Sequence, residues 1–501
     1  MEERLSGRTQ LSGIFHRDRD WPITCINRCI KDELTVISAP QVFDDTKQAL
    51  LREGLTHHRE GRLDEARQLY YRLLASEPGH ADCLHLLGMT FFQAGNADEA
   101  IGLIRSAIAF HPLGASYHAN LGNILQSLEK DAEAEACYRA SLSIRPNQAE
   151  VWMNLGHVLK KRGRPEASLH CYEQALRIDP QMNEAKAGMG TSLLLQGKFL
   201  RGWKLSESRW QTRDWSDRPR IESSPRWHGE NLGSNRVLIW GEQGVGDEIM
   251  FAGLVPDILA TGTRCVLACE PRLGPLFARS FPGAEVVSLH NPGQSLESDI
   301  AAQIPSGSLP GLFRKTAADF GHTTSPYLTS NLAVRDHFRN KYKDGRPLVG
   351  VAWHTKNQAS GRARSIKLAS LAPLFANHDV RWISLQYGNH EALQAEVAAS
   401  ADPVFLDDDV DQLQDMDLFA AQVAAMDLVV TIDNSTAHLA AALGVPTWVM
   451  LPYAPDWRWL LKRQDSPWYP TLRLFRAEEP GKWTPVVERV CSELRATFPL
   501  I

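Results

Sequence analysis

A glycine-rich segment contains the first residues that could do chemistry. Gly244 and Gly246 come shortly after an apolar run, 237–240, and Asp247 follows them. Glycines permit a tight turn, so its amides and the next helix N-terminus can approach an anionic or polar ligand. The Asp247 carboxylate could accept a proton from a reacting hydroxyl. Two alternatives stay open. One is an NAD- or FAD-binding fold using Glu270, although the order here is G-x-x-G-x-G, and the other is a plain helix cap at Asp247.

A second segment, 431–446, combines short polar side chains with a helix of small residues. A buried strand is expected to end at Ile432, and the helix that begins near Ser435 has unpaired amides in its first turn. A diphosphate would fit that helix N-terminus. The alternative is an ordinary helix cap with a structural aspartate and a structural histidine. The candidate ligand-binding residues are Asp433, Asn434, Ser435, Thr436 and His438.

Four further residues complete the candidate site. Arg364, just before a predicted helix, is the best candidate for a cationic partner of phosphate, and Lys356 is the second. Either could instead be a solvated surface charge. Trp353 and Gln386 follow predicted strands and could line a nucleotide pocket, although Trp at the end of a strand is as often a packing residue.

Two clusters of similar side chains have uncertain roles. The acidic run 407–409 looks like a metal-binding triplet of another transferase fold, but a solvated loop is the preferred interpretation. We therefore expect no metal site and no cofactor. The aromatic-rich segment 457–469 could cover a cleft or stack on a sugar, and packing explains it equally well. Its residues of interest are Trp457, Arg458, Trp459, Trp468 and Tyr469.

An internal repeat organises the first half of the chain. Glycines recur every 34 residues from Gly54, and prolines recur with the same spacing from Pro78. Gly in one helix and a small residue twelve positions later let two antiparallel helices approach, and the proline ends the pair. The pattern resembles the tetratricopeptide repeat. This resemblance implies a helical solenoid whose groove holds a peptide or partner protein, with a purely scaffolding role as the alternative.

The second half alternates predicted strands and helices. The run 237–240, a helix over 247–259 and the run 265–268 form a βαβ unit. Further strands are predicted at 348–353, 381–385, 427–432 and 447–451. Two doubly wound lobes are implied, and ligands bind beyond the carboxyl ends of such strands. We expect the loops after residues 240, 353, 385 and 432 to face one cleft.

The predicted domain limits follow from these patterns. Residues 1–44 fit no repeat and are expected to form a poorly ordered leader or a loose cap. The repeat array occupies 45–215, and a linker rich in helix-breaking residues occupies 216–235. The two lobes occupy 236–346 and 347–501, and the second includes a terminal helix.

Composition excludes several classes of function. The chain has 501 residues, with 54 Lys and Arg against 59 Asp and Glu, a formal net charge of −5. This balance argues against nucleic acid as a partner. No window of 18 uninterrupted apolar residues exists, so no membrane span is expected. Eight scattered cysteines indicate free thiols in a reducing compartment, and we expect a cytoplasmic protein.

The two polar motifs carry a second resemblance. Residues 431–446 resemble the hinge signature of heptosyltransferase-type glycosyltransferases (glycosyltransferase family 9), and 245–247 with Pro256 resemble their N-terminal signature. Stretches between 350 and 475 are similar to bacterial proteins that join tetratricopeptide repeats to such a domain. The resemblance implies an α-helical repeat solenoid followed by an α/β part with two Rossmann-like lobes of GT-B type, the second holding a donor-binding hinge.

The resemblance also implies an activity. A hexosyl or heptosyl group would pass from a nucleotide-sugar donor to a glycan, lipid-linked or protein acceptor, with inversion and without a metal. Asp247 would activate the acceptor, Asp433 would contact the donor sugar, and 434–436 would hold phosphate oxygens. Two alternatives remain: a non-catalytic adaptor with an inactive transferase-like domain, and a protein O-linked sugar transferase.

Overall fold

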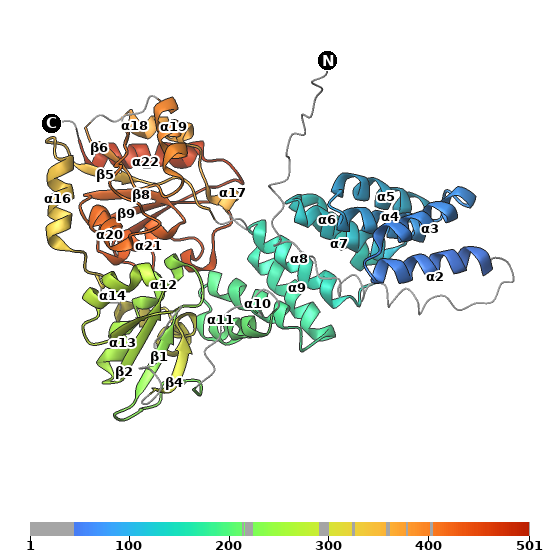
Figure 1. The fold of residues 1–501 in the computed structure, drawn as a ribbon, viewed down its shortest axis with the longest axis horizontal. Helices are drawn as coiled ribbons and strands as arrows, with labels where there is room; N and C mark the ends of the chain where they lie inside the picture. Colours follow the sequence, from blue (N-terminus) through green and yellow to red (C-terminus); the bar gives the residue numbers. More distant parts are fainter. Residues whose placement is uncertain are drawn as a thin grey trace, which may run out of the picture. The chain divides into compact units, whose positions relative to one another are not determined.

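The fold is described from a computed structural model (Figure 1). It describes residues 45–212, 215, 224–289, 300–322, 326–356, 361–376, 379–400 and 404–499. The predicted leader, 1–44, and part of the predicted linker, 216–223, lie outside the described residues. The chain forms two compact units, Met1–Leu155 and Gly156–Ile501. The division falls inside a helix of the repeat array, whereas the array was predicted to end at residue 215.

The described part of the first unit consists of antiparallel helix pairs. Its helices are α2 (Asp45–Arg59), α3 (Leu63–Ser76), α4 (Ala81–Gln93), α5 (Ala97–Phe110), α6 (Ala115–Ser127) and α7 (Asp131–Ile144), and α8 (Ala149–Lys161) begins in this unit. Gly61 and Gly95 end the first helix of two pairs with positive φ values of 77° and 86°. In the third pair, which lacks this glycine, Glu129 takes the left-handed conformation instead (φ 60°).

The glycine series makes room for tyrosine rings. A Cβ atom on Gly54 would lie 2.6 Å from the ring of Tyr70, and one on Gly122 would lie 2.7 Å from that of Tyr138. Each tyrosine comes sixteen residues after its glycine. The small residue predicted at twelve positions is also buried, as Ala66 shows. The close approach of the helices therefore depends on a ring packed over a glycine as well as on the small residue.

In the second unit, the array continues into the α/β part. Its remaining elements are α9 (Pro165–Ile178), α10 (Asn183–Leu195), α11 (Phe199–Ser206) and the 3-10 turn η1 (Glu207–Gln211). Phe199 and Trp203 of α11 belong to the same hydrophobic core as residues of the first β-sheet. The indole of Trp203 also donates a hydrogen bond to the carbonyl of Arg314 (2.8 Å). The last repeat helix is thus part of the core of the α/β region.

The first sheet is parallel and has the strand order β3-β2-β1-β4. Its strands are β1 (Arg236–Trp240), β2 (Arg264–Cys269), β3 (Glu285–Ser288) and β4 (Ile300–Pro305). Its helices are α12 (Val245–Ala252), α13 (Val255–Ala260), α14 (Gly274–Ser280) and α15 (Pro310–Phe313), with 3-10 turns η3 (Pro271–Leu273), η5 (Ser306–Ser308) and η6 (Ala318–His322).

One expectation about this region is corrected, and one contact was not expected. The helix predicted over 247–259 is two helices, because the chain turns at Gly253 and Leu254 and Pro256 starts a new helical turn. The predicted linker is partly structural, since Gln303 of β4 exchanges backbone hydrogen bonds with Pro225 and Trp227 (2.9 and 2.8 Å). These bonds extend the sheet at its β4 edge.

The second sheet is also parallel, with the order β10-β9-β8-β5-β6-β7. Its strands are β5 (Leu348–Val351), β6 (Arg381–Ser384), β7 (Val404–Phe405), β8 (Leu428–Ile432), β9 (Thr447–Leu451) and β10 (Leu472–Arg476). One face packs against α20 (Met416–Ala424) and α21 (Ser435–Ala442), and the other against α18 (Ala372–Phe375), α19 (His390–Ser400) and α22 (Thr484–Thr497) (Figure 1). Strands covered on both faces explain the continuous apolar runs of the sequence.

The remaining elements connect the sheets or border the second one. They are α16 (Leu332–Tyr342), α17 (Gly361–Arg364), η7 (Leu368–Leu371) and η8 (Trp457–Trp459). The strand order reverses between β1 and β4 in the first sheet and between β5 and β8 in the second. Open α/β sheets bind ligands at such points, beyond the carboxyl ends of the strands. Among the described residues, no helix is both long and apolar enough to cross a bilayer.

Candidate functional site

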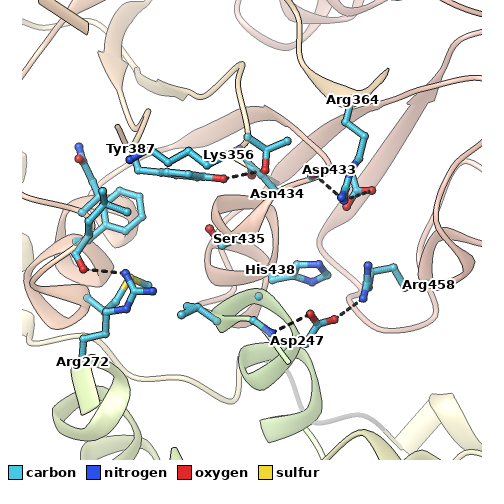
Figure 2. Close-up of a pocket in the computed structure, with 18 residues that line it drawn as sticks. Asp247, Arg272, Lys356, Arg364, Tyr387, Asp433, Asn434, Ser435, His438 and Arg458 are labelled. Atoms are coloured by element: carbon cyan, nitrogen blue, oxygen red, sulfur yellow. Dashed lines mark hydrogen bonds and ion pairs between the residues drawn. The ribbon is translucent and has the colours of Figure 1, made fainter. Parts of the chain in front are cut away.

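A cavity of about 270 Å³ lies at the carboxyl ends of both sheets (Figure 2). The loops after β1, β5 and β8 all contribute to its wall, as expected from the strand order. Nine of the twelve predicted site residues line it; their roles stay predictions. These nine are Gly244, Gly246, Asp247, Lys356, Arg364, Asp433, Asn434, Ser435 and His438.

Two helix N-termini meet at this cavity. A Cβ atom on Gly246 would lie 3.4 Å from the Cα of Ser435 and 3.2 Å from the His438 ring, so the glycine allows α12 and α21 to approach closely. The first amides of both helices lack intrahelical partners. Asn434 caps α21 by accepting a hydrogen bond from the Ala437 amide (3.2 Å). Its Nδ2 is buried and has no hydrogen-bond partner among the described residues. These groups provide donors for an anionic ligand.

Asp247 is both a helix-capping residue and part of the cavity wall. Its Oδ2 accepts a long hydrogen bond (3.4 Å) from the amide of Gly244, the N-cap of α12. Its Oδ1 forms an ion pair with Arg458 of η8, which fixes the carboxylate from the opposite side (Figure 2). The side chain keeps 21% of its surface exposed. The capping interpretation and the functional one are therefore compatible, and Oδ2 is the oxygen with weaker bonding.

Asp433 is buried behind the cavity surface and paired with Arg364. Nη1 of Arg364 donates to Oδ2 of Asp433 at 3.0 Å, and the aspartate is 1% exposed. Burial raises the pKa of Asp433, while the guanidinium groups of Arg364 and Arg458 oppose that rise. The charge of Arg364 is thus shared with a protein carboxylate. Lys356, in contrast, is exposed on the cavity wall.

His438 lines the cavity as a neutral ring. Burial lowers its pKa well below the ordinary value, and the positive charges of Arg458 and Arg364 lower it further. Its Nδ1 shares a hydrogen bond with the hydroxyl of Tyr469 (2.9 Å), and its ring stacks on Trp459. Trp459 and Tyr469 are buried, so this part of the aromatic-rich segment packs inside the protein. His438 can offer a hydrogen bond to a ligand but no charge.

Three predicted site residues do not line the cavity. Trp353, Gln386 and Thr436 are completely buried. The side-chain oxygen Oε1 of Gln386 accepts hydrogen bonds from the amides of Trp353 (2.8 Å) and His354 (2.7 Å), so it ties the loops after β5 and β6 together. The Trp353 ring belongs to the core on the α22 side of the sheet. A position at the end of a strand does not determine which side of the loop its side chain occupies.

Sequence reasoning missed five polar residues of the cavity: Arg272, Thr355, Tyr387, Gln412 and Arg458. Arg272 follows β2 and donates to the carbonyl of Leu413 (2.7 Å). The hydroxyl of Tyr387, which follows β6, donates to Thr355 (3.0 Å). The rule about carboxyl ends of strands could have found these. Arg458 was noticed only as part of the aromatic-rich segment, and no periodic signal marks it.

The acidic run is a structural element. Asp407 is buried and pairs with Lys341 (2.7 Å), which also pairs with the exposed Asp409 (2.6 Å). Tyr342 donates a further hydrogen bond to Asp407. The prediction of a solvated loop is therefore wrong for Asp407. Within the described ranges, no group of three or more His, Cys, Asp or Glu residues could hold a metal ion.

We expect the buried Glu248, next to Asp247, to make the stability of the protein depend on pH. Burial raises its pKa from 4.5 to about 7. Between these pH values the folded state keeps a proton that the unfolded chain releases, so the free energy of unfolding falls as pH rises. Glu248→Gln removes this ionisation but still accepts the hydrogen bond from the Glu270 amide. Relative to this variant, the protein should lose up to about 3 kcal/mol between pH 5 and pH 8, measured by thermal unfolding.

The exposed Glu488 provides the matched control for this experiment. Glu488→Gln makes the same chemical change at the surface, so it should keep the pH dependence of the unaltered chain. An equal fall in stability for Glu248→Gln would show that the buried carboxyl group is not responsible.

Known proteins match the chain in part. Sequence models of the family "Tetratricopeptide repeat" match residues 57–124, 115–148 and 149–182. Protein FlbA of Caulobacter vibrioides is 34% identical over 330 residues, which cover 61% of this chain and 54% of FlbA. The chain thus matches about half the length of this relative.

Solved structures also match part of the chain. A crystal structure of MamA protein is 21% identical, with a TM-score of 0.30, and the match covers 33% of this chain and 91% of MamA. Pseudomonas aeruginosa PilF is 20% identical, with a TM-score of 0.31, covering 33% of this chain and 75% of PilF. The family matches and the observed helix pairs confirm the predicted repeat. Residues 57–182 are tetratricopeptide repeats.

Proposed function

We propose that the chain is a glycosyltransferase that moves a sugar from a nucleotide-sugar donor to an acceptor hydroxyl. The proposal rests on one observation: Asp247 and the N-terminus of α21 line the same cavity. In this proposal the two sheets are the lobes of a GT-B arrangement. The tetratricopeptide repeats supply a surface for a protein partner, as concave repeat arrays do.

The charges of the cavity support a diphosphate ligand. Four cationic side chains line the wall, against the two carboxylates Asp247 and Asp433; the cations are Arg272, Lys356, Arg364 and Arg458. The first-turn amides of α12 and α21 and the unpaired Nδ2 of Asn434 add neutral donors. Preorganised donors of this kind stabilise the negative charge that develops on a leaving diphosphate.

The proposed reaction is a single displacement. The acceptor hydroxyl gives its proton to Asp247 while its oxygen attacks the anomeric carbon. The bond from that carbon to the diphosphate oxygen breaks, and the nucleoside diphosphate leaves with the electron pair. Attack from the side opposite the leaving group inverts the anomeric configuration. Positive side chains and helix amides carry the leaving charge, and the scheme calls for no metal.

A non-catalytic adaptor remains the alternative function. The repeats alone would suit it, since concave repeat surfaces bind partners without chemistry. The catalytic proposal is preferred because the cavity combines a partly exposed carboxylate, Asp247, with the unpaired buried donor of Asn434. An inactive domain has no need for either feature.

Lys356 provides the test of ligand binding. Its ammonium group lies exposed on the wall, so Lys356→Gln should weaken nucleoside diphosphate binding by roughly tenfold without disturbing the fold. Isothermal titration against a panel of nucleoside diphosphates and nucleotide sugars measures this change. Arg364 is less suitable, because replacing it would leave the buried Asp433 without the partner it has at 3.0 Å.

The exposed Lys367 offers a control of equal charge outside the cavity. Lys367→Gln should bind nucleotides like the unaltered chain. If neither the chain nor any variant binds a nucleoside diphosphate, the transferase proposal fails and the adaptor function is favoured.

A further inference from the structure

A second cavity, also of about 270 Å³, lies within the second unit between the repeat helices and the first sheet. Its repeat side is formed by α8 and by one face of α10, on which residues recur at helical spacing: Glu184, Ala187, Gly188 and Thr191. Its other side includes Gln243 after β1, Gly307 after β4 and Trp457 of η8. The repeats and the α/β region thus share this cavity.

Polar side chains line part of the second cavity. The Oγ of Ser206 and the Nε of Arg209 are buried and have no hydrogen-bond partner among the described residues. Lys160 donates to the hydroxyl of Thr191 (2.9 Å), and burial lowers the pKa of this lysine. The carboxylate of Glu184 supplies an acceptor on the same wall. Donors and acceptors therefore stand together, as recognition of a polypeptide backbone and its side chains requires.

Aromatic rings complete the wall. Trp203 and Trp457 meet edge to face with centroids 5.2 Å apart, and Trp215 and Phe251 also line the cavity. Apolar rings beside a few fixed polar groups are typical of ligand-binding pockets. The cavity is large enough for a few side chains of a bound segment.

The two cavities are neighbours along three segments. Gln243 lines the second cavity and the adjacent Gly244 lines the first. In the same way, Trp457 lines the second cavity and the adjacent Arg458 lines the first. On α12, Phe251 lines the second cavity four residues after Asp247, which lines the first. Residues four apart lie on the same face of a helix. Asp247 therefore lies one helical turn from the wall of the second cavity.

We propose that the second cavity binds the acceptor as an extended polypeptide segment whose Ser or Thr hydroxyl reaches Asp247. A polypeptide is favoured over a free saccharide because α8, a helix of the matched tetratricopeptide repeats, forms part of the wall. The transfer step rests on the proposed function and forms the bond from the Ser or Thr oxygen to the sugar carbon. The binding site itself does not rest on it.

The test measures peptide binding without nucleotide. Full-length protein is immobilised and exposed to a display library of random peptides, each with a central serine or threonine. Ala187→Trp places an indole in the second cavity and should lower the retained peptide by roughly tenfold. Glu184→Gln, which keeps the shape, should lower it several-fold. The exposed Glu166→Gln on α9 makes the same change away from the cavity and should leave retention unchanged.

Nucleotide titration on the same proteins separates the two proposals. Unchanged nucleotide binding by Ala187→Trp, together with lost peptide, supports the acceptor site. Equal peptide retention by the chain and Ala187→Trp overturns it, as does a chain that retains no peptide. An oligosaccharide panel that binds the chain and is blocked by Ala187→Trp overturns the polypeptide class. If no nucleotide binds while the peptides behave as expected, the transferase proposal alone fails.

Discussion

Asp247→Asn should lower the rate of sugar transfer by roughly a thousandfold, since a positioned general base contributes about 10²–10⁴ to a rate. Asparagine keeps the shape, and its one carbonyl oxygen can still accept the hydrogen bond from Arg458, but it loses the acceptor for the long bond from the Gly244 amide and cannot take up the proton of the acceptor. Arg458 retains its second partner, Asp456, at 3.0 Å. Nucleotide affinity should therefore change little. Turnover with the donor found by titration, or slow donor hydrolysis, measures the effect.

Asp456→Asn separates chemistry from positioning. This variant removes the other carboxylate paired with Arg458 and leaves Asp247 in place. We expect it to lose less than about tenfold in rate, because the proton acceptor remains. Equal losses in both variants would mean that Asp247 acts by holding Arg458, and it would then be a positioning residue.

Arg209→Ala should reduce the free energy of unfolding of the second unit by about 3–5 kcal/mol, the usual cost of removing one partner of a buried ion pair. Nη2 of Arg209 donates to both carboxylate oxygens of Glu242 (3.1 and 2.9 Å) and to Ser308 (2.8 Å). The Glu242 side chain is only 1% exposed, so water cannot replace the arginine. A Cβ atom on Gly307 would lie 1.7 Å from Oε1 of Glu242, which shows how tightly the carboxylate is enclosed. Urea unfolding measures the loss.

A double-mutant cycle checks this interpretation. Adding Glu242→Gln to Arg209→Ala removes the buried charge of the Glu242 carboxylate and should restore part of the lost stability. The exposed Arg201 of the same repeat region is the matched control, and Arg201→Ala should cost well under 1 kcal/mol. A small effect of Arg209→Ala, or no recovery in the double variant, would show that the pair contributes little.

Local patterns predicted the repeats and much of the candidate site. The period of the glycines reports contacts between neighbouring helices, so Gly54 and its successors were enough to recognise the repeat. The strand-to-helix order placed Asp247 and Asp433 beyond the carboxyl ends of strands in different sheets, and both now line one cavity. Where function depends on the ends of buried strands, the sequence carries a strong signal.

The remaining features depend on contacts between distant segments. Arg458 approaches Asp247 across 211 residues, and nothing in its own neighbourhood indicates that partner. Gln386 was predicted as a ligand contact but binds neighbouring loops, because the sequence gives its place along the chain and not the side it faces. The sequence likewise did not indicate that Trp227, within the segment predicted as a linker, pairs with Gln303 of a strand that follows much later.

The helix formed by Phe199–Ser206 belongs by sequence to the repeats and by packing to the first sheet. A truncated chain that begins at residue 236 would lack the Trp203 indole, which packs in that core, and would also lack Arg209, which forms an ion pair with Glu242. A shortened version intended to keep the α/β region whole must therefore start before Phe199.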